Sequence, residues 1–145
     1  MEFEILSEPW NKYKLSDKSI LYVRTIAINI IKTGYDEFGK PSYSVTTTTI
    51  YHARAPKELR GNPTMPPPTL EILMDSIVEE VNLIPEREDW NHYKLEDGTT
   101  IKLKTVLPKV QRTTKYDQLG EPLYIIYSQD IVIDDVPKSL WKKSL

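Results

Sequence analysis

The 145-residue sequence contains no cysteine, so it offers neither disulfides nor thiolate metal ligands. A secreted scaffold held together by disulfides is therefore excluded. Glycine occurs only five times and always singly, which excludes a glycine-rich phosphate loop. No apolar run approaches the roughly 20 residues that span a bilayer, and the first residues are acidic where a signal peptide is basic. These absences predict a soluble, cytoplasmic protein with no membrane partner.

The formal net charge is only −2, but the charge is unevenly distributed. Residues 1–68 and residues 91–145 each carry nine bases and seven acids, whereas residues 69–90 carry one base and seven acids. This balance does not indicate the strongly basic surface of a typical nucleic-acid-binding domain. The abundance of Lys, Glu, Ile and Pro without Cys fits a heat-adapted (thermophile) source.

One eight-residue phrase occurs twice, as WNKYKLSD at residues 10–17 and as WNHYKLED at residues 90–97. Around it, residues 10–59 align with residues 90–140 if one extra residue near Thr114 is allowed. Of the 50 paired positions, 17 are identical. That agreement predicts an internal repeat, in which recurring tryptophans and tyrosines anchor the core and recurring Asp, Gly and Pro form turns.

Each repeat has the pattern of a bent antiparallel meander with a short lead-in strand. The Asp97-Gly98 pair predicts a type I′ hairpin turn, and Lys18 at the matching position predicts a looser turn in the first repeat. In the long strand that follows, the apolar alternation slips by one residue at Thr25 and at Thr105. This slip predicts a β-bulge at each threonine. The core face is then expected to continue through Ile26, Ile28 and Ile30 in the first repeat and through Val106, Pro108 and Val110 in the second.

The segment between the repeats is rich in proline and then acidic. Thr69 is a suitable N-cap, and the spacing of the apolar residues predicts a helix that ends near Val78. The apolar face of this helix is expected to contain Leu70, Leu73, Met74, Ile77, Val78 and Val81.

The sequence therefore predicts an all-β fold with one connecting helix, built by tandem duplication of a meander of three to four strands. The two meanders, related by a pseudo-twofold axis, form either a barrel-like body or two packed sheets. Closure is favoured, because separate small sheets would have thin cores and open edges. Residues 1–60 form the first β repeat, residues 61–79 the Pro-rich loop and helix, and residues 80–145 the second repeat, all within one compact unit.

No residue pattern points to catalysis, to a cofactor or to a metal ion. His52 and His92 do not recur between the repeats and have no partner at a metal-ligand spacing. Asp130, Asp134 and Asp135 cluster near the end of the last strand, but their spacing matches no known ligand loop, so a solvated strand end is expected. The sequence thus favours a protein that is not an enzyme.

The most suggestive constellation is basic, with an occasional aromatic residue such as Tyr22, on the solvent side of the long strands. Such a face could follow a nucleic-acid single strand whose bases stack on rings, although lysines also protect sheet edges. The candidate binding surface consists of Arg24, Lys94, Lys102, Lys104, Lys109 and Arg112.

Three functional hypotheses remain open. The leading one is a non-enzymatic interaction module that binds a protein partner or self-associates. The first alternative is a β protein that binds single-stranded nucleic acid. The second is a small-ligand barrel or hydrolase whose site lies between the repeats.

Overall fold

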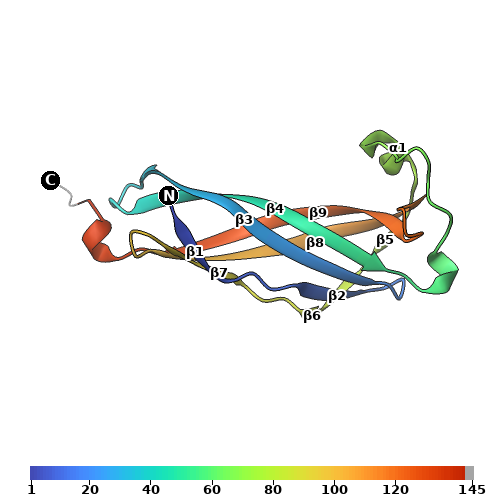
Figure 1. Cartoon of the computed structure of the whole chain (residues 1–145), viewed down its shortest axis with the longest axis horizontal. Coiled ribbons are helices and arrows are strands. Elements are labelled where there is room, and N and C mark those ends of the chain that lie inside the picture. Colours follow the sequence, from blue (N-terminus) through green and yellow to red (C-terminus); the bar gives the residue numbers. More distant parts are fainter. Residues whose placement is uncertain (143–145) are drawn as a thin grey trace.

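The computed structural model describes residues 1–142, which form two antiparallel β-sheets and one short helix (Figure 1). The predicted all-β class with a connecting helix is confirmed. The strands are β1 (Phe3–Ser7), β2 (Asn11–Leu15), β3 (Ile20–Tyr35), β4 (Pro41–Arg54), β5 (Ile77–Val81), β6 (Leu83–Arg87), β7 (Asn91–Leu95), β8 (Thr100–Tyr116) and β9 (Pro122–Asp135). Helix α1 spans Leu70–Asp75, and short 3₁₀ helices follow β4 (Lys57–Leu59) and β9 (Lys138–Leu140).

The two sheets are each organised around one long strand. In the β3 sheet the order is β4-β3-β2-β6. In the β8 sheet, β9 pairs with one side of β8, β7 and β5 pair with the other side, and β1 pairs with β7. Of the two predicted arrangements, the two-sheet one is correct and the barrel is wrong. Among the described residues no barrel closes, because β4 and β9 each pair with a single strand.

The short lead-in strands are exchanged between the two halves of the chain. Strand β1 precedes β2 in sequence but pairs with β7, with Ile5 opposite Tyr93. Strand β6 precedes β7 but pairs with β2, with Leu83 opposite Leu15. The alternating pattern identified both strands, yet alternation alone does not say which strand is the neighbour.

The hydrophobic core consists of two clusters, and each contains residues from both halves. One cluster combines residues of β2 and β3 with two from β5 and β8: Tyr13, Leu15, Leu21, Val23, Val81 and Val110. The other combines two residues of β3 with four from β7 and β8: Ala27, Ile30, Tyr93, Leu95, Ile101 and Leu103. Neither core can be completed by one half alone.

Equivalent positions of the two similar stretches make equivalent contacts with the opposite half. The hydroxyls of four tyrosines donate to carboxylates in this reciprocal way: Tyr13 to Glu88, Tyr93 to Glu8, Tyr124 to Asp17 and Tyr43 to Asp97. Thr25 and Thr105, which are themselves equivalent, share a hydrogen bond of 2.5 Å. Duplication as the origin of this likeness stays a prediction.

The predicted bulges exist, but at different residues. The register shifts between Ala27 and Asn29 in β3, not at Thr25, and between Val106 and Lys109 in β8. Thr25 and Thr105 point into the interior, where their hydroxyls satisfy each other, so the core face includes a polar residue that the sequence pattern had placed outside. As a result Ile28, predicted to be in the core, is 60% exposed.

The first hairpin turn of each half has the same geometry in both copies. The amide of Lys18 donates to Leu15, the amide of Gly98 donates to Leu95, and both Lys18 and Gly98 have positive φ angles of 73° and 92°. Only one positive φ occurs in each turn, so the type I′ prediction is wrong. Each is a longer loop, a type I turn followed by a left-handed residue. The expectation of a looser first turn is also wrong, because the hydrogen bonds are equivalent.

The connecting helix is shorter than predicted. Thr69 caps it as expected, with its side chain accepting a hydrogen bond from the amide of Ile72. It ends at Asp75, because Ile77 and the residues after it form β5 and pair with β8. The expected apolar face is therefore split between a helix and a strand, and Leu70 stays exposed.

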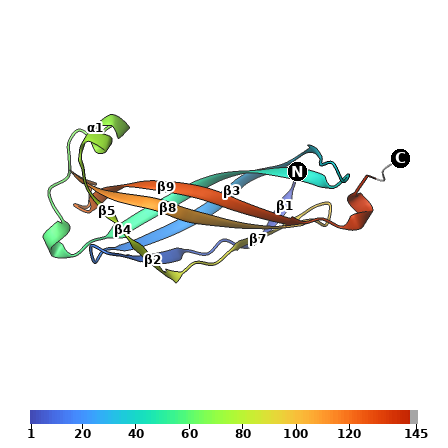
Figure 2. The same cartoon turned by 180° about the vertical axis from the view of Figure 1, so that it is seen from behind.

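The molecule is elongated along the two long hairpins. In both views α1 lies at one end of the molecule and the described C-terminal end lies at the other (Figures 1 and 2). The tip of each long hairpin contacts the segment that follows the other: the amide of Lys142 donates to Gly39, and that of Gly61 donates to Gly120.

Candidate functional site

The cations predicted to form a binding surface are spread over both sheets, and most are already engaged. Lys102 and Lys104 lie over the ring of Trp90, with their ammonium nitrogens 5.1 and 5.6 Å from its centre. Lys104 also pairs with Glu88 at 2.9 Å. Of these two lysines, Lys102 has the more accessible charge.

The remaining candidates on the strands are also surrounded by acceptors. Lys109 lies 3.7 Å from Glu80 and over the ring of Tyr127. The Nε of Arg24 donates to the backbone carbonyl of Glu8 at 2.9 Å. Lys94 borders a shallow hollow that also contains Glu2, Glu4 and Glu96. A polyanion would therefore meet neighbouring carboxylates at most of these positions.

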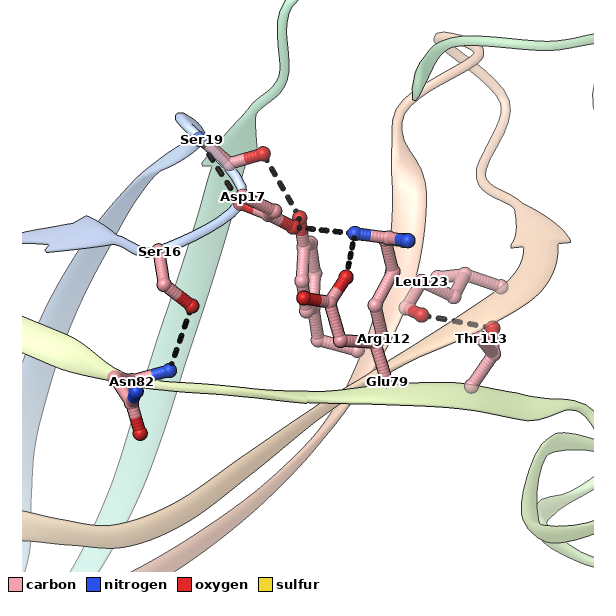
Figure 3. A network of polar contacts seen from close by, with 9 residues as sticks. Ser16, Asp17, Ser19, Glu79, Asn82, Arg112, Thr113 and Leu123 are labelled. Carbon is pink, nitrogen blue, oxygen red and sulfur yellow. Dashed lines mark hydrogen bonds and ion pairs between the residues drawn. The ribbon is translucent and has the colours of Figure 1, made fainter.

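Arg112 links the two halves of the chain (Figure 3). Its Nη1 donates to Asp17 at 3.1 Å and to Glu79 at 2.8 Å. The Asp17 side chain is only 3% exposed and that of Arg112 is 16% exposed. The Tyr124 hydroxyl donates to the same Asp17 oxygen at 2.7 Å. Arg112 thus acts in this structure as the counter-ion of a buried carboxylate.

The environment of Asp17 shifts its pKa. Burial acts to raise the pKa of this carboxyl, but hydrogen bonds from Tyr124, from Ser19 and from Arg112 outweigh burial and hold the pKa below its ordinary value. Burial likewise raises the pKa of Tyr124 well above its ordinary value. The network therefore favours a charged aspartate beside a neutral tyrosine and a charged arginine.

Replacing Asp17 with asparagine is expected to flatten the acid dependence of stability. A carboxyl whose pKa is lowered in the folded state stabilises the fold at pH values above its unfolded-state pKa, which is about 3.9 for aspartate. This stabilisation is lost as the pH falls through the folded-state pKa. The difference between wild type and Asp17→Asn in free energy of unfolding should thus be largest at pH 7 and shrink towards pH 3. Urea unfolding at pH 7, 5, 4 and 3 measures it. A difference that stays constant over this range would contradict the assignment.

A shallow aromatic groove lies on the solvent face of the β3 sheet. It has a volume of about 510 Å³ and is lined by Trp10, Tyr22, His52 and Arg54. Trp10 was predicted to be a core anchor but is 41% exposed. The sequence placed Tyr22 on a solvent face but did not bring Trp10, His52 and Arg54 to it. The predicted β3–β4 hairpin, once its register is known, places Tyr22 opposite His52.

The connector between the halves exposes several large apolar side chains. Over residues 64–78, the exposed fractions are 72% for Met65, 67% for Leu70, 45% for Ile72, 45% for Met74 and 55% for Val78. Both ends of the segment are nevertheless fixed to β8. The amide of Thr64 donates to Tyr116, and the amide of Thr114 donates to Ser76. The connector is thus anchored and apolar at its surface.

Beneath the connector, a cavity of about 360 Å³ lies between α1, β4 and β9. Its walls are mainly apolar and include Leu73, Tyr51 and Ile126. Few polar groups converge there, and the region between the sheets is filled by the two core clusters. Residues 1–142 also contain no group of three or more acidic or histidine side chains placed to hold a metal ion.

The chain matches no protein-family model, no curated protein and no solved structure. Within the described residues, no helix combines the length and the apolar character needed to cross a membrane.

Proposed function

We propose that this chain is a non-enzymatic protein-binding module whose connector, residues 64–78, docks into an apolar groove with a basic rim on a partner protein. The main support for this proposal is the concentration of exposed large apolar side chains on that anchored segment. Monomeric proteins rarely leave such clusters uncovered unless the cluster binds something.

The geometry of α1 suits insertion into a groove. Leu70 and Met74 are four residues apart, so they lie on the same face of the helix. Leu73 lines the cavity against β4 and β9, and Leu70 borders the same cavity while staying 67% exposed. This packing fixes the orientation of the helix before a partner arrives, which lowers the entropy cost of binding.

The charges of the connector indicate the kind of partner. Glu71 and Asp75 lie on α1 beside the exposed apolar residues, and neither forms an ion pair within the described part of the chain. A twofold contact between two connectors would bring these like charges together. A partner with Lys or Arg around an apolar groove would complement them.

The double substitution Leu70→Ser with Met74→Ser is expected to abolish partner capture while leaving the fold intact. Anchor residues of a helix in a groove each contribute about 2 kcal/mol or more, so capture should fall by more than about 30-fold. Exposed substitutions typically change stability by less than about 0.5 kcal/mol. The measurement is quantitative mass spectrometry of proteins retained from a native extract by wild-type and variant chains.

The matched control is Phe38→Ser with Leu119→Ser, which removes two equally exposed apolar side chains from the hairpin tips. The proposal requires a protein that wild type and this control retain, that the connector variant loses, and that Glu71→Gln with Asp75→Gln retains less well. If no retained protein depends on the connector, the proposal is wrong. A dimer seen by light scattering that the connector variant dissociates would also overturn it, since the occupant would be a second copy.

A further inference from the structure

We propose, beyond the protein-binding function, that the aromatic groove on the solvent face of the β3 sheet binds single-stranded nucleic acid by stacking a base on Trp10. The four residues that line this groove are not among the cations of the surface predicted from the sequence. The groove adjoins the connector through His52, which also lines the cavity beneath α1, but none of its lining residues belongs to residues 64–78.

The rings of the groove form a platform with a wall. Tyr22 and His52 are cross-strand neighbours on β3 and β4, with ring centres 6.1 Å apart and planes 27° from parallel. Trp10 completes the groove and is exposed. Bases of any identity stack on such rings, because every base has a π face.

Trp10 differs from the other tryptophans in having an open ring. Trp90 carries Lys102 and Lys104, and Trp141 carries Lys40, within 6.0 Å of their ring centres. Among the described residues, no cation or second ring lies over Trp10. A flat ligand that stacks on it therefore has no cation and no second ring to displace.

Cations border the groove from the strands on both sides of Tyr22. Arg54 on β4 and Lys12 on β2 lie 6.0 and 5.9 Å from the centre of the Tyr22 ring on β3. Arg54 forms no ion pair with any described carboxylate, whereas Lys12 shares Glu86 with Lys14. The face is basic and aromatic even though the whole chain is slightly acidic.

The equivalent face of the β8 sheet lacks the ring pair and supplies a control. Lys102 pairs there with Ile133, where the β3 sheet pairs Tyr22 with His52. Trp90 is already covered by lysines. Stacking should therefore depend on Trp10 and be insensitive to Trp90.

The test is fluorescence anisotropy of a labelled 15-nucleotide oligothymidine and a labelled oligouridine of equal length, titrated with the full chain at 50 mM salt. We expect a micromolar Kd and an affinity that falls as salt is added. The logarithm of the association constant should fall with the logarithm of the salt concentration, with a slope of about −0.7 for each phosphate contacted. Trp10→Ala and Tyr22→Leu should each weaken binding by about 5- to 150-fold. Arg54→Gln should reduce the salt slope by about one contact.

The controls decide the assignment. Trp90→Ala and the connector variant Leu70→Ser with Met74→Ser should bind the oligonucleotides within about twofold of wild type, with thermal melts confirming that each variant is folded. The proposal is overturned by any of three results: no anisotropy change at 50 mM salt, equal losses for Trp10→Ala and Trp90→Ala, or equal affinity for duplex DNA or for thymidine monophosphate. Equal affinity for duplex DNA would mean that the groove recognises charge alone. Equal affinity for thymidine monophosphate would mean that its ligand is a free nucleotide. Failure here would leave the connector proposal untouched.

Discussion

Fragments comprising residues 1–68 and residues 69–145 are each expected to be unfolded on their own and to fold cooperatively when mixed. The first fragment contains β2, β3 and β4 but lacks β6, which borders β2. The second lacks β1, which borders β7. Each fragment thus loses an edge of its sheet as well as one side of both cores.

Both core clusters are built from residues of both halves of the chain. Tyr13 and Leu21 in the first cluster pack with Val81 and Val110 of the other half. Fully burying one such side chain contributes about 1.5–3 kcal/mol, and a whole domain is stable by only about 5–15 kcal/mol. Losing one side of both clusters therefore exceeds the stability available to a half-length chain, which is marginal by size in any case.

Circular dichroism during heating measures this prediction. Each fragment alone should show no cooperative transition, and the equimolar mixture should show one whose midpoint rises with concentration, because the association is bimolecular. The full chain provides the reference. A cooperative melt of either isolated fragment would contradict the prediction.

Arg112→Ala is expected to lower the free energy of unfolding by about 3 kcal/mol at pH 7, the lower end of the range for breaking a buried ion pair, because Arg112 keeps some exposure. The substitution leaves the Asp17 carboxylate inside the protein with hydrogen bonds from Tyr124 and Ser19 but without its cation. The cost arises mainly from that uncompensated charge.

A double-mutant cycle separates this cost from lost packing. When Asp17 is already asparagine, removing Arg112 no longer strands a charge, so the second substitution should cost much less. Urea unfolding of the four proteins measures the coupling, with Lys109→Ala as a control, since its pair with Glu80 is exposed and long at 3.7 Å. Exposed pairs of this kind contribute less than about 1 kcal/mol. An Arg112→Ala protein as stable as Lys109→Ala would show that the network is dispensable.

The strands were predictable from sequence because their signal is local. Alternation, turn residues and the repeated phrase identified the hairpins and the lead-in strands, and Thr69 identified the start of the helix. The exchange of β1 and β6 was not predictable, because pairing partners are set by which edges meet in three dimensions. The predicted positions of the bulges were wrong for a related reason. Thr25 is acceptable in the core because its hydroxyl is hydrogen-bonded with those of Thr105 and Thr49.

The candidate site was less accessible to sequence reasoning than the fold. Lys104 and Arg112 read as free cations, but their carboxylate partners lie 16 and 95 residues away in sequence. Trp10 read as a core residue because large aromatic residues usually are. Positions that match between the two similar stretches do make matching contacts, since Asp17 and Asp97 both accept a hydrogen bond from a tyrosine of the other half.

The exchange of the short strands also determines when this chain can fold during its synthesis. Strand β1 is synthesised before its neighbour β7, which begins at Asn91, more than eighty residues later. At about 5–20 residues per second, β1 waits several seconds before its pairing partner exists. The pairing of β1 with β7 must then form after β7 has been synthesised, through contacts between distant segments, which is the slow regime for two-state domains.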